Sequence, residues 1–228
     1  MAKPTNKKAP GVPGEVAAIN KAIRDFLNQQ DSNGRVIGGS QFGVYAFYDY
    51  DHEPIYVGQT REKLRARIGR HLTNQRTDAV AMNVLDPFEV ATIEVWPIYQ
   101  DNYVGRDLQD VLNEAEFAVF QLVLRKSNIG AVLNEKDIAK QAEITLPASF
   151  AARIIPEGIY EARKHPDIRL ARRASTIANL ARVISERDVS KGLRRTLLTQ
   201  AKRLELLAGK RFAEIGGDIP VKAEQEEE

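Results

Sequence analysis

The feature that most constrains the fold is a pair of short aromatic segments, GVYAFYDY at residues 43–50 and EPIYVGQT at residues 53–60. Both are rich in aromatic and β-branched residues, which favour strands, and the Asp and His between them suit a turn. The sequence therefore predicts an antiparallel β-hairpin. Two triplets, Gly43-Val44-Tyr45 and Tyr56-Val57-Gly58, then lie side by side in it, although ten residues separate them in the chain.

Hydrophobic periodicity predicts the elements around this hairpin. Residues 14–30 carry apolar side chains at helical spacing, and residues 61–75 do so with a very basic surface. Residues 87–100, PFEVATIEVWPIYQ, have the pattern of a third strand. Residues 106–126 form the strongest helical pattern, with an apolar stripe that should face the sheet. We therefore expect an α+β fold with a small three-stranded antiparallel sheet flanked by helices.

The pattern changes after this core. We expect an N-terminal arm and helix at residues 1–40, a core at 41–140, and a helical, basic extension with an acidic tail at 141–228. In the extension, PASFAARII at residues 147–155 and two longer segments have helical patterns without strands. Residues 161–211 hold fourteen Lys and Arg against five Asp and Glu. Such clustering is typical of phosphate binding, although solvated helix faces also carry many cations.

Composition excludes several classes of protein and of site. The chain contains no cysteine, which excludes disulfides, thiolate zinc sites and cysteine nucleophiles. No apolar run approaches the roughly 20 residues that a membrane span needs, and the basic N-terminus is not followed by the apolar segment of a secretory signal. We expect a cytoplasmic protein.

Further residues complete a pattern around the two triplets: Arg67 and His71, four apart on a helix, then Glu116, then Asn134. Together they resemble the GIY-YIG nuclease family, whose catalytic fold is a three-stranded antiparallel sheet flanked by helices and whose members cut phosphodiester bonds. The resemblance covers residues 41–136, with valine for the middle isoleucine of each triplet. Among the subgroups, the chain looks most like the type II restriction endonucleases of this family. The catalytic residues that the resemblance implies are Tyr45, Tyr56, Arg67, His71, Glu116 and Asn134.

Phosphodiester hydrolysis explains why these residue types would be needed, because it requires an activated water and neutralisation of charge in the transition state. Tyr45 could orient or deprotonate the water if a nearby cation favours its phenolate. Arg67 can supply that charge and a forked phosphate contact. Tyr56 could hydrogen-bond the nucleophile or simply pack, and His71 could relay a proton or contact phosphate. We expect Asn134 to brace the site through backbone hydrogen bonds.

Periodicity distinguishes two carboxylates on the helix at residues 106–126. At about 100° per residue, Glu114 falls on a solvated stripe, whereas Glu116 falls among apolar residues. A buried carboxylate needs a cation or hydrogen-bond donors, so we favour a metal ion over a salt bridge to a neighbouring arginine. A single carboxylate ligand suits Mg²⁺, with Mn²⁺ as a substitute.

The basic residues expected to contact the DNA backbone are Arg61, Lys63, Arg65, Arg70, Arg172, Arg173, Arg194 and Arg195. The sequence thus predicts a divalent-metal-dependent endonuclease acting on double-stranded DNA, most specifically a sequence-specific restriction endonuclease. Two alternatives stay open: a structure-specific repair or recombination nuclease, and a non-cleaving nucleic-acid-binding protein. The C-terminal helices could bind DNA or form a homodimer, which a palindromic recognition site would favour.

Overall fold

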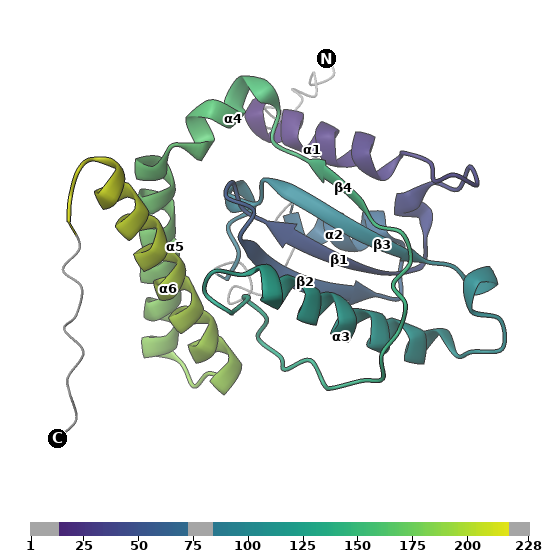
Figure 1. Ribbon diagram of the computed structural model, residues 1–228. Coiled ribbons are helices and arrows are strands. Elements are labelled where there is room, and N and C mark those ends of the chain that lie inside the picture. Colours follow the sequence, from purple (N-terminus) through teal and green to yellow (C-terminus); the bar gives the residue numbers. More distant parts are fainter. Residues whose placement is uncertain (1–13, 73–83, 219–228) are drawn as a thin grey trace, which may run out of the picture.

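The computed structural model describes residues 14–72 and 84–218 (Figure 1). The rest of the predicted N-terminal arm and the acidic tail lie outside the described residues. The centre of the molecule is an antiparallel sheet with the strand order β2-β1-β3-β4. Its strands are β1 (Phe42–Tyr48), β2 (Pro54–Thr60), β3 (Thr92–Ile98) and β4 (Phe150–Arg153). The α-helices are α1 (Gly14–Leu27), α2 (Leu64–Leu72), α3 (Leu108–Lys126), α4 (Glu157–Lys164), α5 (Pro166–Glu186) and α6 (Lys191–Glu214). Short 3₁₀ turns are η1 (Ile37–Gly39), η3 (Pro87–Glu89) and η4 (Gln100–Tyr103).

The predicted hairpin is confirmed as β1 and β2, and its register explains the glycine of each triplet. Tyr45 lies opposite Gly58, where a Cβ atom would come within 2.6 Å of the Tyr45 hydroxyl oxygen. At Gly43 a Cβ atom would come within 2.9 Å of Leu64 Cδ1 in α2. Since such distances are shorter than side-chain packing allows, glycine leaves room for the tyrosine ring in one place and for α2 in the other.

Alternation along the strands gives the sheet two apolar faces, each covered by helices (Figure 1). Tyr45 and Phe47 of β1 point to the face that packs against α1 and α2. Val44 and Ala46 point to the opposite face, which α3 covers. The apolar stripe predicted for residues 106–126 does face the sheet, through the buried residues Val111, Leu112, Ala115, Val119 and Val123. The α+β fold with an antiparallel sheet is therefore confirmed.

The fourth strand corrects one sequence prediction. Residues 147–155 were expected to be helical, yet Phe150–Arg153 form β4, which pairs with the free edge of β3 from Thr92–Arg153 to Val95–Phe150. Alanine has little strand propensity, and two of the four residues of β4 are alanine. This strand therefore depends on the hydrogen bonds that the edge of β3 offers. The segment beyond residue 140 is therefore not purely helical.

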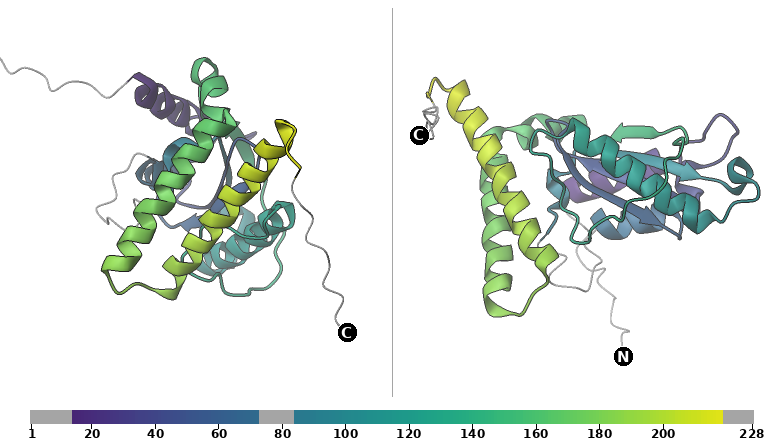
Figure 2. Two further views of the ribbon diagram at one scale, coloured as in Figure 1. Left: turned by 90° about the vertical axis from the view of Figure 1, so that its left-hand side faces the viewer. Right: turned by 60° about the horizontal axis from the view of Figure 1, so that its bottom comes forward.

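The remaining helices form a C-terminal unit at one end of the sheet, where α5 and α6 lie side by side (Figure 2). Leu180 of α5 and Leu193 of α6 are buried in the same core cluster as Tyr45 and Phe47. The helices thus share the core of the sheet. Among the described residues, we find no helix with the length and apolar character that crossing a membrane would require.

Buried charges join this helical unit to the hairpin. Asp49, at the end of β1, is 2% exposed and accepts hydrogen bonds from Arg173 (2.8 Å) and Arg203 (2.7 Å). Arg169 also pairs with Asp49, and Arg173 donates to Glu89 in η3 (2.9 Å). Because Arg173 is 4% exposed and directed at these carboxylates, the prediction that it contacts DNA is wrong.

Candidate active site

The hairpin and α2 bring four of the predicted catalytic side chains together. Tyr45 is fully buried, and its ring lies 6.1 Å from that of Tyr56 and 5.7 Å from that of His71, measured between ring centroids. The Tyr45 hydroxyl oxygen is 3.3 Å from His71 Nε2. Arg67 Nε donates to the same hydroxyl at 3.2 Å. The tyrosine hydroxyl is thus held between a guanidinium and an imidazole.

The sequence of α2 explains this arrangement. Leu64, Ile68 and Leu72 form its buried side, and Arg67 and His71 follow each other by one turn along the adjacent side. Burial alone would lower the pKa of Arg67, but the hydroxyls of Tyr45 and of the second hairpin tyrosine raise it above its usual value. Arg67 therefore stays charged in the site, where its guanidinium donates to the Tyr45 hydroxyl.

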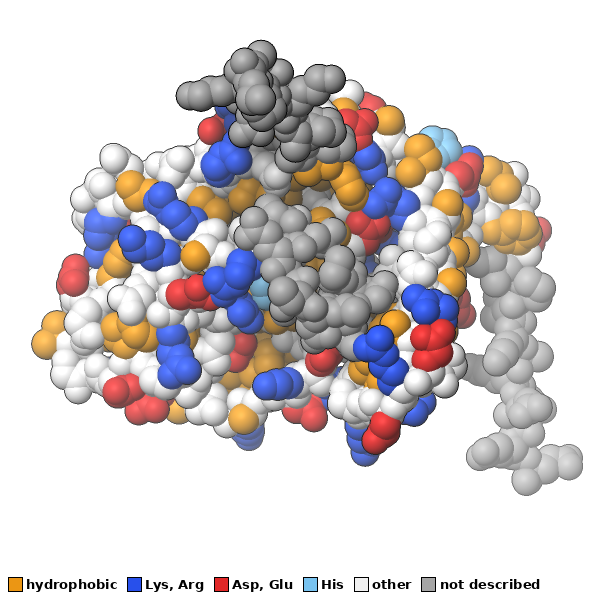
Figure 3. Space-filling view, turned by 180° about the vertical axis from the view of Figure 1, so that it is seen from behind, with side chains coloured by type: hydrophobic (Ala, Val, Ile, Leu, Met, Phe, Trp, Pro, Cys, Tyr) orange, Lys and Arg blue, Asp and Glu red, His pale blue; other side chains and the backbone are white. Residues whose placement is uncertain are grey.

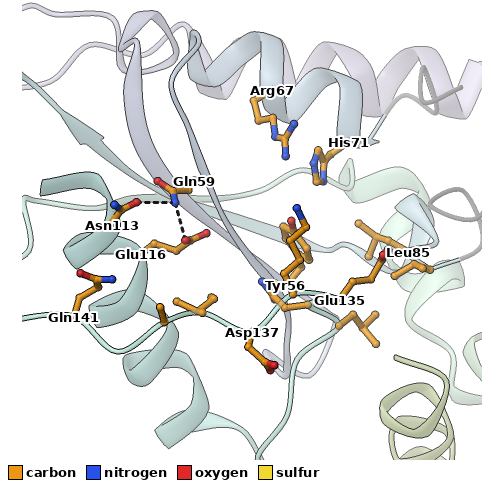
Figure 4. Close-up of a pocket in the computed structure, with 16 residues that line it drawn as sticks. Tyr56, Gln59, Arg67, His71, Leu85, Asn113, Glu116, Glu135, Asp137 and Gln141 are labelled. Carbon is orange, nitrogen blue, oxygen red and sulfur yellow. Dashed lines mark hydrogen bonds between the residues drawn. The ribbon is translucent and has the colours of Figure 1, made fainter. Parts of the chain in front are cut away.

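Glu116 approaches the same cleft from α3, as Figure 4 shows. Its carboxylate accepts a hydrogen bond from Gln59 Nε2 at 2.9 Å, and Gln59 also donates to Asn113 at 3.2 Å. Burial raises the pKa of Glu116 to about 6, although the Gln59 bonds and the charge of Arg67 act to lower it. Glu114, in contrast, pairs with Arg106 and does not line the cleft.

Asn134 lies on the segment that follows α3. Its side chain accepts from Val57 N at 3.2 Å and donates to Val57 O at 2.7 Å. These bonds occupy both backbone groups of the residue between Tyr56 and Gly58. Asn134 thus holds the backbone of β2 at Val57.

The cleft has a volume of about 600 Å³ and runs across the edge strand β2. Arg67 and His71 enter it from α2 on one face of the sheet, and Glu116 enters from α3 on the other (Figure 4). Five of the six predicted catalytic residues line it, namely Tyr56, Arg67, His71, Glu116 and Asn134. Tyr45 lies behind this wall, in contact with Arg67 and His71.

The sequence prediction missed several polar residues of the cleft: Gln59, Asn113, Glu135, Lys136 and Asp137. Two of them had a signal in the sequence. Gln59 follows the second triplet directly, two residues after Val57 and so on the α3 side of β2. Asn113 precedes Glu116 by three residues and so shares its side of α3.

The described residues of the cleft do not form a ready-made cage for a metal ion. Within residues 14–72 and 84–218, no three His, Asp or Glu side chains gather in a way that could hold a metal. The half-buried Glu116 carboxylate, with its raised pKa, nevertheless fits a hard cation that keeps most of its water ligands. Such a cation would neutralise a charge that the protein compensates only in part.

The predicted DNA-contacting residues differ in how accessible they are. Arg61, Lys63 and Arg194 are exposed. Arg70 pairs with Glu62, and Arg172 makes a forked contact with Asp86 at 2.8 and 2.9 Å. Arg65 is exposed and donates to Gly38 O at 3.2 Å, whereas the donors of Arg195 are directed at residues 134–137. Seen from behind, Lys and Arg are spread over the described surface with Asp and Glu between them (Figure 3).

Comparison with known proteins bears on the same residues. Residues 41–104 match the model of the GIY-YIG catalytic domain. The match runs from β1 through α2 and β3 and includes both tyrosines, Arg67 and His71; it ends before α3, so Glu116 lies outside it. No curated protein and no solved structure matches the chain. The GIY-YIG match supports a nuclease, a class that acts on nucleic acid and generally uses divalent metals.

Proposed function

We propose that this chain is a divalent-metal-dependent DNA endonuclease and, more specifically, a sequence-specific restriction endonuclease acting on double-stranded DNA. The observation that carries the proposal is the convergence of Arg67 and His71, which line one side of the cleft, on the Tyr45 hydroxyl behind them, while Glu116 enters from the other side. The GIY-YIG match over residues 41–104 supports the nuclease class. The restriction role is supported by the resemblance seen in the sequence.

In the proposed reaction, the aromatic and basic residues transfer the proton of the attacking water and bind the phosphate. Arg67 holds the Tyr45 hydroxyl through a 3.2 Å hydrogen bond. Tyr45 lies behind the wall of the cleft, so it orients or deprotonates the attacking water by way of His71, which lines the cleft 3.3 Å from the Tyr45 hydroxyl. Tyr56, which lines the cleft, positions the same water. The remaining donors of Arg67 contact the phosphate.

Glu116 is the residue that would hold the metal ion, Mg²⁺ or Mn²⁺. When bound, such an ion supplies Lewis-acid stabilisation of the charge that develops on the phosphate. Gln59 keeps the Glu116 carboxylate directed into the cleft through its 2.9 Å hydrogen bond. Asn134 keeps β2, and with it Tyr56, in place.

We further propose that the parts of the chain outside the cleft support DNA binding. We divide it into an N-terminal part (residues 1–40), a nuclease core (41–140) and an extension (141–228). The exposed cations Arg61, Lys63 and Arg194 contact phosphates, which sequence-independent affinity requires. The extension adds affinity or forms a two-fold homodimer in which each protomer cuts one strand.

Incubation of supercoiled plasmid with Mg²⁺, with Mn²⁺ and with EDTA tests the proposal. Discrete linear fragments with either metal and intact plasmid in EDTA are the expected result. Preferential cutting of branched DNA over plasmid would instead assign a structure-specific nuclease. Binding without cleavage under every condition would leave a nucleic-acid-binding protein and refute the enzymatic role.

A further inference from the structure

The edge of β2 is covered by the segment that follows α3. Leu133 N donates to Ile55 O at 2.7 Å, and the Asn134 side chain pairs with both backbone groups of Val57. Backbone groups on a sheet edge otherwise have no ladder partner and leave the strand less restrained. The position of Val57, and of Tyr56 next to it, therefore depends on where this segment is held.

Arg195 of α6 holds the same segment from outside. Its Nη2 donates to Asn134 O at 3.1 Å and to Glu135 O at 2.9 Å, while Nη1 pairs with Asp137. The helix also approaches very closely, since a Cβ atom at Gly192 would clash with the Glu135 carbonyl oxygen. The segment thus lies between the edge of β2 and the first turns of α6.

We propose that Arg195 is a positioning residue for the cleft: it fixes the Asn134 segment, Asn134 fixes the edge of β2, and β2 places Tyr56. This inference rests on the proposed nuclease function and gives Arg195 a different role from the phosphate contact that its charge predicts. A planar guanidinium can serve two carbonyls and a carboxylate together, whereas the ammonium of lysine cannot reproduce that fork. The C-terminal helices therefore contribute to catalysis as well as to packing.

Arg194 provides a matched control, because it is the exposed neighbour of Arg195 on α6 and its replacement removes the same charge. For Arg195→Gln we expect kcat to fall about 10- to 100-fold, as small misplacements in active sites do. KM and the salt dependence of DNA binding should change little, and Arg195→Lys should restore only part of kcat. Arg194→Gln, which removes a proposed phosphate contact, should instead raise KM and flatten the slope of log affinity against log salt by about 0.9.

Hydrogen exchange at the Val57 amide measures the same coupling without any cleavage. We expect Arg195→Gln to speed this exchange about tenfold, the change that weakening one hydrogen bond allows. Gly192→Ala should act in the same direction, because it pushes α6 away from Glu135. Arg194→Gln should leave the exchange at Val57 unchanged.

The inference is overturned if Arg195→Gln and Arg194→Gln behave alike, with unchanged kcat, unchanged exchange at Val57 and the same shift in salt dependence. Failure of the nuclease proposal gives a different result: no metal-dependent cleavage by the wild-type chain. In that case the exchange at Val57 still decides whether Arg195 holds the edge of β2.

Discussion

Replacement of Glu116 by glutamine should remove cleavage and at the same time make the metal-free protein more stable. The Glu116 carboxyl lies in the cleft with Gln59 as a hydrogen-bond donor, and burial raises its pKa from 4.5 to about 6. At ~1.4 kcal/mol per pH unit, this difference corresponds to about 2 kcal/mol of folding free energy lost when the group is ionised. Glutamine has nearly the same shape, keeps an oxygen for Gln59 and carries no charge.

The direction of the pH dependence follows from the raised pKa of Glu116. Its contribution to stability is present in full below 4.5 and is lost as pH rises through about 6. The wild-type protein and Glu116→Gln should therefore unfold with the same free energy near pH 4.5. At pH 8 the variant should be more stable by up to about 2 kcal/mol, or roughly 4 to 8 °C in Tm for a chain of this length.

Thermal unfolding in EDTA at both pH values, combined with plasmid cleavage in Mg²⁺ at pH 8, checks this prediction. Added Mg²⁺ should raise the Tm of the wild-type protein but not that of the variant. Glu114→Gln is the control: its carboxylate pairs with Arg106 outside the cleft, so cleavage should persist and Tm should not rise. Wild-type cleavage by Glu116→Gln, or a lower Tm at pH 8, would refute the reasoning.

Three further substitutions test the chemical step, the folding stability and the DNA affinity separately. Tyr45→Phe removes only the hydroxyl that accepts from Arg67, so the single-turnover rate should fall by at least about 100-fold while affinity in a gel-shift assay stays the same. Arg173→Gln leaves Asp49 and Glu89 short of a buried partner and should lower the unfolding free energy in urea by about 3–5 kcal/mol. Lys63→Gln removes an exposed charge and should flatten the salt slope of binding by about 0.9 on every DNA sequence; an unchanged slope would place DNA elsewhere.

The elements that could be predicted from the sequence are those whose signal is local. The hairpin combines strand-forming residues with a turn, and the helix at 106–126 has a continuous apolar stripe. Part of the candidate site could also be predicted from the sequence, because its signal is local as well. Arg67 and His71 are one helical turn apart, and Glu116 could be separated from Glu114 by angle alone.

The features that could not be predicted depend on partners far away in the chain. The sequence of β4 has a helical pattern, and it forms a strand because it pairs with the edge of β3. Arg173 resembles a surface cation, although it precedes the buried Leu180 by seven residues and so shares its side of α5. Its carboxylate partners, Asp49 and Glu89, come from the sheet region, and no pattern within residues 166–186 reveals them.

These buried ion pairs give the excess of Lys and Arg in the C-terminal extension a different interpretation. Arg169, Arg173 and Arg203 neutralise carboxylates inside the protein, so they add nothing to a field that attracts phosphate. What they do is hold α5 and α6 against Asp49, which follows β1 at the turn of the hairpin. Since Arg195 on α6 contacts the segment that braces β2, the helices act on the hairpin at two places. Part of the local positive charge therefore serves to hold the two tyrosine-bearing strands in one geometry, and DNA affinity must come from the cations that remain exposed.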